Sequence, residues 1–208
     1  ITSSQNVQLL PGKSYTITLK FELGIQLAAS DINLTQNGCT ASDKNYLAKL
    51  RWATGNLKST GSTNYIWAPS QTETGYYYTW YSTYTGNKTT NNTDPCSKLN
   101  TAYYGTGWRT PSENDYIPLS RCTDKVLTNG GMWFMNKSIG IFLLAAGTIG
   151  NGGGSATSNP NYSTAKTGQY WTSKKDGENR GISFTFNPSS TFMFSDYQAT
   201  GIPVRCVK

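Results

Sequence analysis

The sequence predicts an exported protein of the all-β or α+β class with polar loops. Of its 208 residues, 36% are hydrophobic and 13% aromatic, which supplies enough apolar side chains for a hydrophobic core. Only 14% are charged, whereas disordered chains are poor in aromatic residues and rich in charge. Several short segments alternate apolar and polar residues, as half-buried strands do, and the helical signals are few.

The first thirty residues differ from the rest of the chain. After a Pro11-Gly12 turn, apolar side chains alternate with polar ones from Tyr15 to Phe21, which predicts a half-buried strand. One strand cannot form a domain. We therefore expect residues 1–30 to be the last strand of an upstream domain or an extra strand on this one, residues 31–45 to be a linker, and residues 46–208 to be the main domain.

The main domain is predicted to be built largely of short strands. The apolar run "GIFLLAAG" at 140–147 is too short to cross a bilayer and is typical of a buried strand. Further β-prone segments lie at 46–56, 75–82, 130–136, 170–173, 181–187, 191–197 and 201–208. Residues 148–168 form a long, glycine-rich loop, and loops of this length in compact domains are functional or disordered.

Two short helices are predicted from their first residues. Asp94 caps the first, with Pro95 at its first helical position. For the second, over 111–117, Thr110 is the expected N-cap and Glu113 its capping-box partner, with Pro118 ending or kinking the helix. This interpretation gives Glu113 a structural role in place of a catalytic one.

The composition also bounds the compartment and the chemistry. Four cysteines without metal-knuckle spacing indicate two disulfides and an oxidising compartment, with four buried thiols as the alternative. The sequence begins without Met or a signal-peptide pattern, so we expect Ile1 to be a mature or trimmed end. Histidine is absent, which removes the commonest general base and the His-dependent triads. We therefore expect no enzymatic activity.

The charge pattern does not favour a nucleic-acid partner. The formal net charge is +7, but the basic residues are scattered and Lys174-Lys175 is their only adjacent pair. Nucleic-acid surfaces need clustered Lys and Arg, so we interpret the charge as a basic, solvated surface.

Six short motifs, in order along the chain, resemble the FISUMP family of bacterial surface domains. They are "RWATGNL" (51–57), "DPC" (94–96), "GWRTPSENDY" (107–116), "LLAAG" (143–147), "GQYWTS" (168–173) and "VRCVK" (204–208). That family is similar to the formylglycine-generating-enzyme branch of the C-type-lectin-like fold. The resemblance covers 46–208 and implies an α+β fold with two short helices, small twisted antiparallel sheets and a long loop region.

"LLPGKSYTITLKFE" (9–22) is similar to the closing strand of fimbrillin-type β-sandwiches. Together the two resemblances imply the C-terminal part of a fimbrial tip or accessory subunit at the bacterial cell surface. They also imply a Cys96–Cys206 disulfide, which leaves Cys39 to pair with Cys122. The lectin calcium motifs are missing, and there is no Asp or Glu from Lys125 to Lys175, so we expect neither a metal nor a cofactor. The alternative is a calcium site to which Asp176, Glu178 and Asp196 contribute from neighbouring loops.

Two functions follow as hypotheses. The first is an adhesion module that binds a glycan or a host surface protein and associates with other fimbrial subunits. Amide, carboxylate and aromatic side chains suit such recognition; the candidate ligand-binding residues are Asn151, Asn159, Asn161, Tyr162, Tyr170, Asp176, Glu178, Arg180 and Tyr197. The residues expected to be structural are Trp52, Trp108, Arg109, Thr110, Glu113 and Trp171. The second function is a pilus assembly or capping subunit with no ligand of its own, for which an exposed strand edge is a natural joint.

Overall fold

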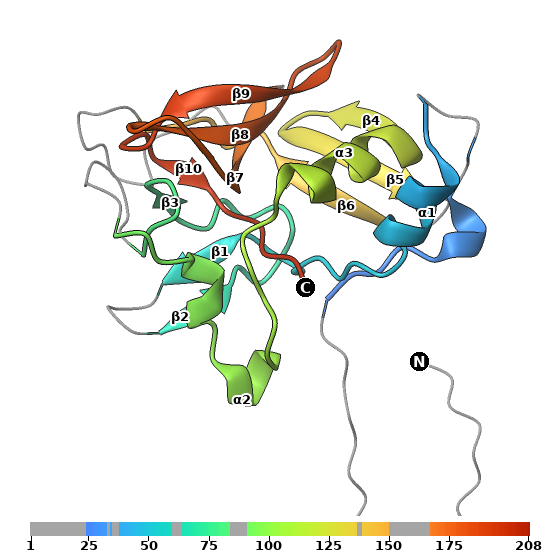
Figure 1. Cartoon of the computed structure of the whole chain (residues 1–208). Helices are drawn as coiled ribbons and strands as arrows, with labels where there is room; N and C mark the ends of the chain where they lie inside the picture. Colours follow the sequence, from blue (N-terminus) through green and yellow to red (C-terminus); the bar gives the residue numbers. More distant parts are fainter. Residues whose placement is uncertain are drawn as a thin grey trace, which may run out of the picture.

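Few helices and several small antiparallel sheets make up a mixed α+β architecture (Figure 1). The computed structural model describes residues 24–32, 34, 38–59, 64–83, 91–136, 139–149 and 167–208. The strand predicted between Tyr15 and Phe21 and most of the long loop lie outside these residues.

One three-stranded sheet contains the apolar run that the sequence singled out. Its strands are β4 (Asp124–Thr128), β5 (Gly131–Asn136) and β6 (Ile139–Leu144), in the order β4-β5-β6. All of β6 except its first residue is buried. A strand that is covered on both faces is apolar throughout, which explains the unbroken apolar run. The predicted buried strand is therefore confirmed.

A second three-stranded sheet contains β7 (Gly168–Asp176), β8 (Arg180–Phe186) and β9 (Thr191–Tyr197), in chain order. Segments of all three strands were expected to be β-structure, and β8 also shows the alternation of Ile182, Phe184 and Phe186. The pairing of β7 with β8 is interrupted between Trp171 and Lys175 by a shift in register. The two sheets lie side by side, and α3 (Glu113–Cys122) lies in front of the β4–β5–β6 sheet (Figure 1).

The C-terminal segment lies at the centre of the fold (Figure 1). It begins with β10 (Ile202–Pro203), which pairs with β3 (Tyr77–Tyr78), and a separate hairpin joins β1 (Leu57–Ser59) to β2 (Tyr65–Trp67). Beyond β10, Val207 forms isolated bridges with both Trp52 and Arg109. The chain end therefore joins two segments that are far apart in the sequence.

The segment predicted as a linker contains ordered structure. A 3-10 turn spans Ala29–Asp31, and the capping box of Thr40 and Asp43 starts α1 (Ala41–Leu47). Leu27 and Ile32 are buried in the same core as Trp52. Thus the described part of 24–45 packs against the main body, because its apolar side chains complete that core.

The N-terminus of α3 differs from the prediction. Its N-cap is Ser112 and the capping-box partner is Asp115, so the expected pair of Thr110 and Glu113 was wrong. The hydroxyl of Thr110 instead donates to Asp94 at 2.7 Å. The helix also continues through Pro118, because a proline removes a single backbone donor and the buried residues Leu119 and Cys122 beyond it pack into the core.

The first predicted helix has the expected cap. Asp94 accepts from the backbone N–H of Cys96, and Pro95 is the first residue of a 3-10 helix, Pro95–Lys98. A second short helix, α2 (Thr101–Tyr104), follows directly. It projects away from the body at the bottom of Figure 1.

Both disulfides connect distant segments. Cys39 is bonded to Cys122 and Cys96 to Cys206, the pairs that the resemblance implies. Two disulfides are typical of extracellular proteins. Three tryptophans expected to be structural, Trp52, Trp108 and Trp171, are all buried. Among the described residues, no helix has the length and apolar character that a membrane span requires.

Candidate binding surface

A row of three predicted ligand-binding residues crosses one end of the β7–β8–β9 sheet. Asp176 is paired with Arg180 on β8, and Arg180 is paired with Tyr197 on β9. Residues directly opposite in antiparallel strands project from the same face. The three side chains therefore lie next to one another, and we call them the end row.

The turn that begins the row depends on a glycine. Gly177 has a φ of +71°, and a Cβ at this position would meet no atom within 4 Å. A larger residue at this position would have enough space but would be strained by the backbone conformation, because residues with a Cβ rarely adopt a positive φ. Glu178 follows at the exposed tip of this turn.

The middle of the row is held in place by local contacts. The Arg180 guanidinium lies 4.4 Å from the centroid of the Tyr197 ring and donates to the backbone carbonyl of Ser195 at 2.9 Å. Gln198 donates its side-chain amide to the Arg180 carbonyl at 3.1 Å. Tyr197 nevertheless keeps 56% of its surface exposed. The row thus combines a positioned cation, an aromatic face and an exposed carboxylate.

Asp196 does not join this row. It precedes Tyr197 on β9 and is paired with Gly181 on β8. Because successive residues of a strand point to opposite faces, Asp196 projects from the face opposite the end row. Its carboxylate accepts from the Ser183 hydroxyl at 2.7 Å and from Gln169 at 3.2 Å. Burial raises its pKa, and the Ser183 hydrogen bond and the Arg180 charge offset part of that increase. Asp196 therefore stabilises the sheet and does not share a ligand set with Asp176.

Tyr170 was wrongly assigned to the ligand-binding residues. It is fully buried, and its hydroxyl lies 3.2 Å from the carbonyl of Leu144 and 2.8 Å from the backbone nitrogen of the same residue. The side-chain amide of Asn56 also donates to it at 3.2 Å. The remaining predicted residues, Asn151, Asn159, Asn161 and Tyr162, lie outside the described residues.

The "GWRTPSENDY" motif contains a buried carboxylate that the sequence analysis missed. Asp115 is fully buried and accepts hydrogen bonds from Arg109 at 2.6 and 2.8 Å, from the Tyr46 hydroxyl and from Ser112. Burial raises the pKa of Asp115, but the bonds from Arg109 and Ser112 outweigh it and hold the pKa below its ordinary value. The Ser112-x-x-Asp115 spacing was the available signal, because it is also that of a capping box.

Glu113 has a different structural role from the one predicted. Its carboxylate lies 2.7 Å from the Lys174 ammonium, which links the start of α3 to β7. Both side chains are partly exposed, so the pair positions these elements and adds little stability.

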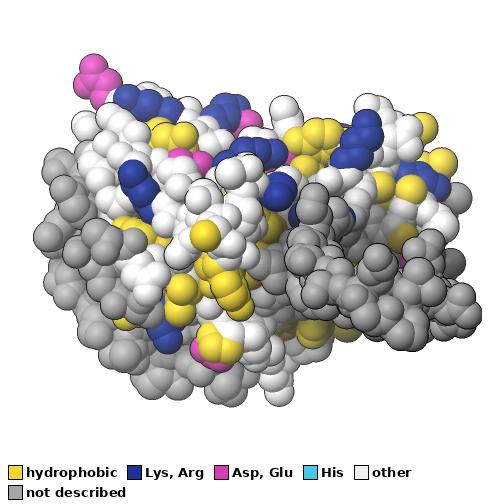
Figure 2. Space-filling model, turned by 90° about the horizontal axis from the view of Figure 1, so that it is seen from below, with side chains coloured by type: hydrophobic (Ala, Val, Ile, Leu, Met, Phe, Trp, Pro, Cys, Tyr) yellow, Lys and Arg dark blue, Asp and Glu magenta, His cyan; other side chains and the backbone are white. Residues whose placement is uncertain are grey.

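The described residues include neither a candidate metal site nor a free cysteine thiol. Within the part of the chain that the structure describes, no three His, Cys, Asp or Glu side chains gather as a metal site would require. Because Cys206 is bonded to Cys96, it has no free thiol. In Figure 2, Lys and Arg side chains are dispersed among polar and hydrophobic ones on the face seen from below.

No family model, curated protein or solved structure matches this chain.

Proposed function

We propose that this chain is a non-catalytic, FISUMP-type lectin-like binding domain of a bacterial fimbrial tip or accessory subunit. It acts at the cell surface and binds a glycan or a host surface protein. The α+β architecture and the two disulfides are compatible with this assignment. We also propose that residues 1–30 contribute the closing strand of an upstream fimbrillin-like domain.

The observation that carries the proposal is the end row. Saccharides present hydroxyls above an apolar ring face, and proteins bind them with charged or amide groups beside an aromatic ring. Arg180 and Asp176 offer donors and acceptors next to the Tyr197 face. Because Arg180 is already held by Ser195, little conformational entropy is lost when a ligand binds.

Binding of the purified protein to a glycan array, with calcium and with EDTA, tests this function. Binding that persists in EDTA supports calcium-independent recognition by the end row. Binding that EDTA abolishes contradicts the expected metal independence. If positive controls work and no glycan binds, glycan recognition is rejected and a protein ligand or an assembly role remains.

A second candidate function is a pilus assembly or capping subunit with no ligand of its own. One observation favours it: among the described residues β9 lies at the edge of its sheet. An unpaired strand edge presents backbone groups that another chain can bind.

A further inference from the structure

A groove between α1, α3 and β9 lies apart from the end row. One cavity of about 360 Å³ lies between α1 and α3, and a second of about 210 Å³ lies between α3 and β9. Ile117 and Arg121 line both, so the two cavities adjoin across these residues. Met193 in the second cavity is four residues from Tyr197, a separation of about 14 Å along a strand. This groove is therefore a surface distinct from the end row.

Arg121 is the cation that lines both cavities. Its side chain is 51% exposed, and its ion pair with Asp43 is long, at 3.9 Å. The same Asp43 oxygen also accepts from the backbone N–H of Thr40, at 3.1 Å. Most of the five guanidinium donors are thus available to an incoming carboxylate.

The path to Arg121 is lined with apolar side chains on one side. Ile117, Phe184 and Met193 line the cavity between α3 and β9. A glutamate side chain has the matching form, because an apolar stem carries a charged head. Lys125 donates to the Ser120 carbonyl at 3.1 Å and so reduces the negative potential at the C-terminal end of α3.

The strand beside the groove has an edge that no lysine, proline or bulge protects. Edges are commonly protected by lysine, proline or a bulge. β9 contains neither lysine nor proline, it keeps regular register with β8, and it has no second partner strand among the described residues. Its backbone therefore offers a row of hydrogen-bonding groups to an extended chain.

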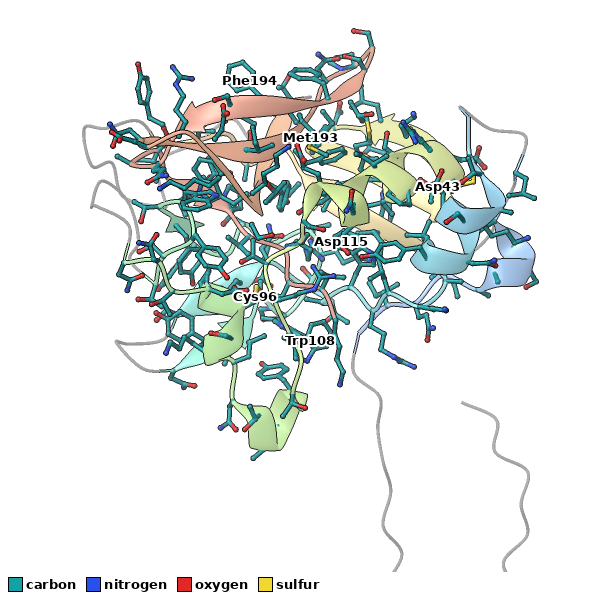
Figure 3. The ribbon with its side chains drawn as sticks, viewed as in Figure 1. Asp43, Cys96, Trp108, Asp115, Met193 and Phe194 are labelled. Atoms are coloured by element: carbon teal, nitrogen blue, oxygen red, sulfur yellow. A yellow bond between two sulfur atoms is a disulfide. The ribbon has the colours of Figure 1, made fainter. Side chains whose placement is uncertain are left out.

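Two exposed aromatic side chains complete the surface. Phe192 and Phe194 are 41% and 47% exposed and project from the face of β9 opposite Met193, as Figure 3 shows for Phe194. On an added strand, alternate side chains would lie beside these rings and the others would point toward α3. β-branched residues suit the first set and glutamate the second.

We propose that this groove binds an extended segment of a partner protein in which β-branched and glutamate residues alternate. The segment adds to the free edge of β9, its apolar side chains cover Phe192 and Phe194, and one glutamate reaches Arg121. The backbone edge favours a peptide over a saccharide, because only a peptide matches its repeating donors and acceptors.

The test uses a labelled, acetylated and amidated heptapeptide, Thr-Val-Glu-Val-Glu-Val-Thr, titrated against the purified protein by fluorescence anisotropy. We expect saturable binding that weakens at least about ten-fold in the Arg121→Gln variant, since a charge-assisted hydrogen bond is lost. The same loss is expected for a peptide with glutamine in place of glutamate. Methylation of alternate peptide nitrogens should also abolish binding, because it removes the donors that pair with the edge.

Matched variants separate this inference from the proposed function. Lys98→Gln removes an exposed positive charge elsewhere and Arg180→Ala disrupts the end row; neither should change peptide binding. Absence of peptide binding, equal binding by Arg121→Gln, or equal binding of the methylated peptide would each overturn the inference. Loss of glycan binding in Arg121→Gln would also overturn it, since the groove would then be the glycan site. Circular dichroism checks that every variant is folded.

Discussion

Arg205, fully buried near the end of the chain, donates its Nε hydrogen to the side-chain carbonyl of Asn56 at 2.9 Å. The other guanidinium nitrogens donate to the backbone carbonyls of Ala53 at 3.1 Å and Phe142 at 2.9 Å. Burial lowers the pKa of Arg205, while the nearby Tyr170 and Tyr116 raise it. One cation thus joins the segment around Asn56, strand β6 and the C-terminal segment.

Replacing Arg205 should therefore destabilise the whole fold. Arg205→Met leaves several buried acceptors without donors, and each unsatisfied group costs about 1–3 kcal/mol. We expect the free energy of unfolding, measured by urea denaturation, to fall by more than about 3 kcal/mol. Arg121→Met, which removes a half-exposed arginine, is the matched control and should change it by less than about 1 kcal/mol. Similar effects of the two substitutions would contradict the central role of Arg205.

The disulfides should carry a large share of the stability. Cys96 and Cys206 are 110 residues apart in sequence and Cys39 and Cys122 are 83 apart. In the chain-entropy model, each closed loop of this length contributes about 4–5 kcal/mol. The double variant Cys96→Ser/Cys206→Ser should therefore lower the melting temperature strongly, and the Cys39–Cys122 pair should show a comparable effect.

Peptide mapping by mass spectrometry without reduction checks the connectivity directly. The expected products join Cys39 to Cys122 and Cys96 to Cys206. A peptide that joins Cys39 to Cys96 would show that the native pairing differs.

Asp115 should make stability depend on acid pH. Its pKa is below the ordinary value in the folded state, so its contribution is complete above about pH 3.9, the unfolded value, and is lost as the pH falls through the folded value. Asp115→Asn should cost about 1–3 kcal/mol at pH 7 and make the acid limb of the stability curve shallower. Urea midpoints measured from pH 7 to pH 2 test this. Asp176→Asn, which alters an exposed carboxylate, is the control and should leave the urea midpoint at pH 7 nearly unchanged.

The end row should contribute to binding and little to folding. An exposed cation–π contact such as that of Arg180 and Tyr197 is worth about 0.5–1 kcal/mol. Arg180→Ala and Tyr197→Ala should therefore shift the unfolding free energy by about 1 kcal/mol or less while weakening glycan binding at least about ten-fold, or 1.4 kcal/mol. Unfolding of either variant would show that the row is part of the framework.

Sequence reasoning proposed Arg180 and Tyr197 because charged and aromatic side chains suit ligand recognition. The fold places the two next to each other, and their role in binding stays a prediction. Tyr170 was misassigned, because its burial depends on Leu144 and Asn56, which only the folded chain brings to it. Arg121 was not a candidate, since its groove is lined by residues of four elements, α1, α3, β8 and β9, that meet only in space.

The sequence by itself determined the local elements. β-prone segments sufficed for β7 and β9, alternation of apolar residues for β8, an unbroken apolar run for β6, and Asp94-Pro95 for a helix start, because each depends on neighbours within a few residues. Tertiary structure decided which of two possible capping boxes forms. Thr110 could have capped the second helix, but Asp94, sixteen residues earlier, takes its hydroxyl, so Ser112 and Asp115 cap it instead. Only the tertiary structure also buries Arg205, because its acceptors come from segments more than sixty residues away in sequence. Contacts between such distant segments cannot be predicted from a local sequence pattern.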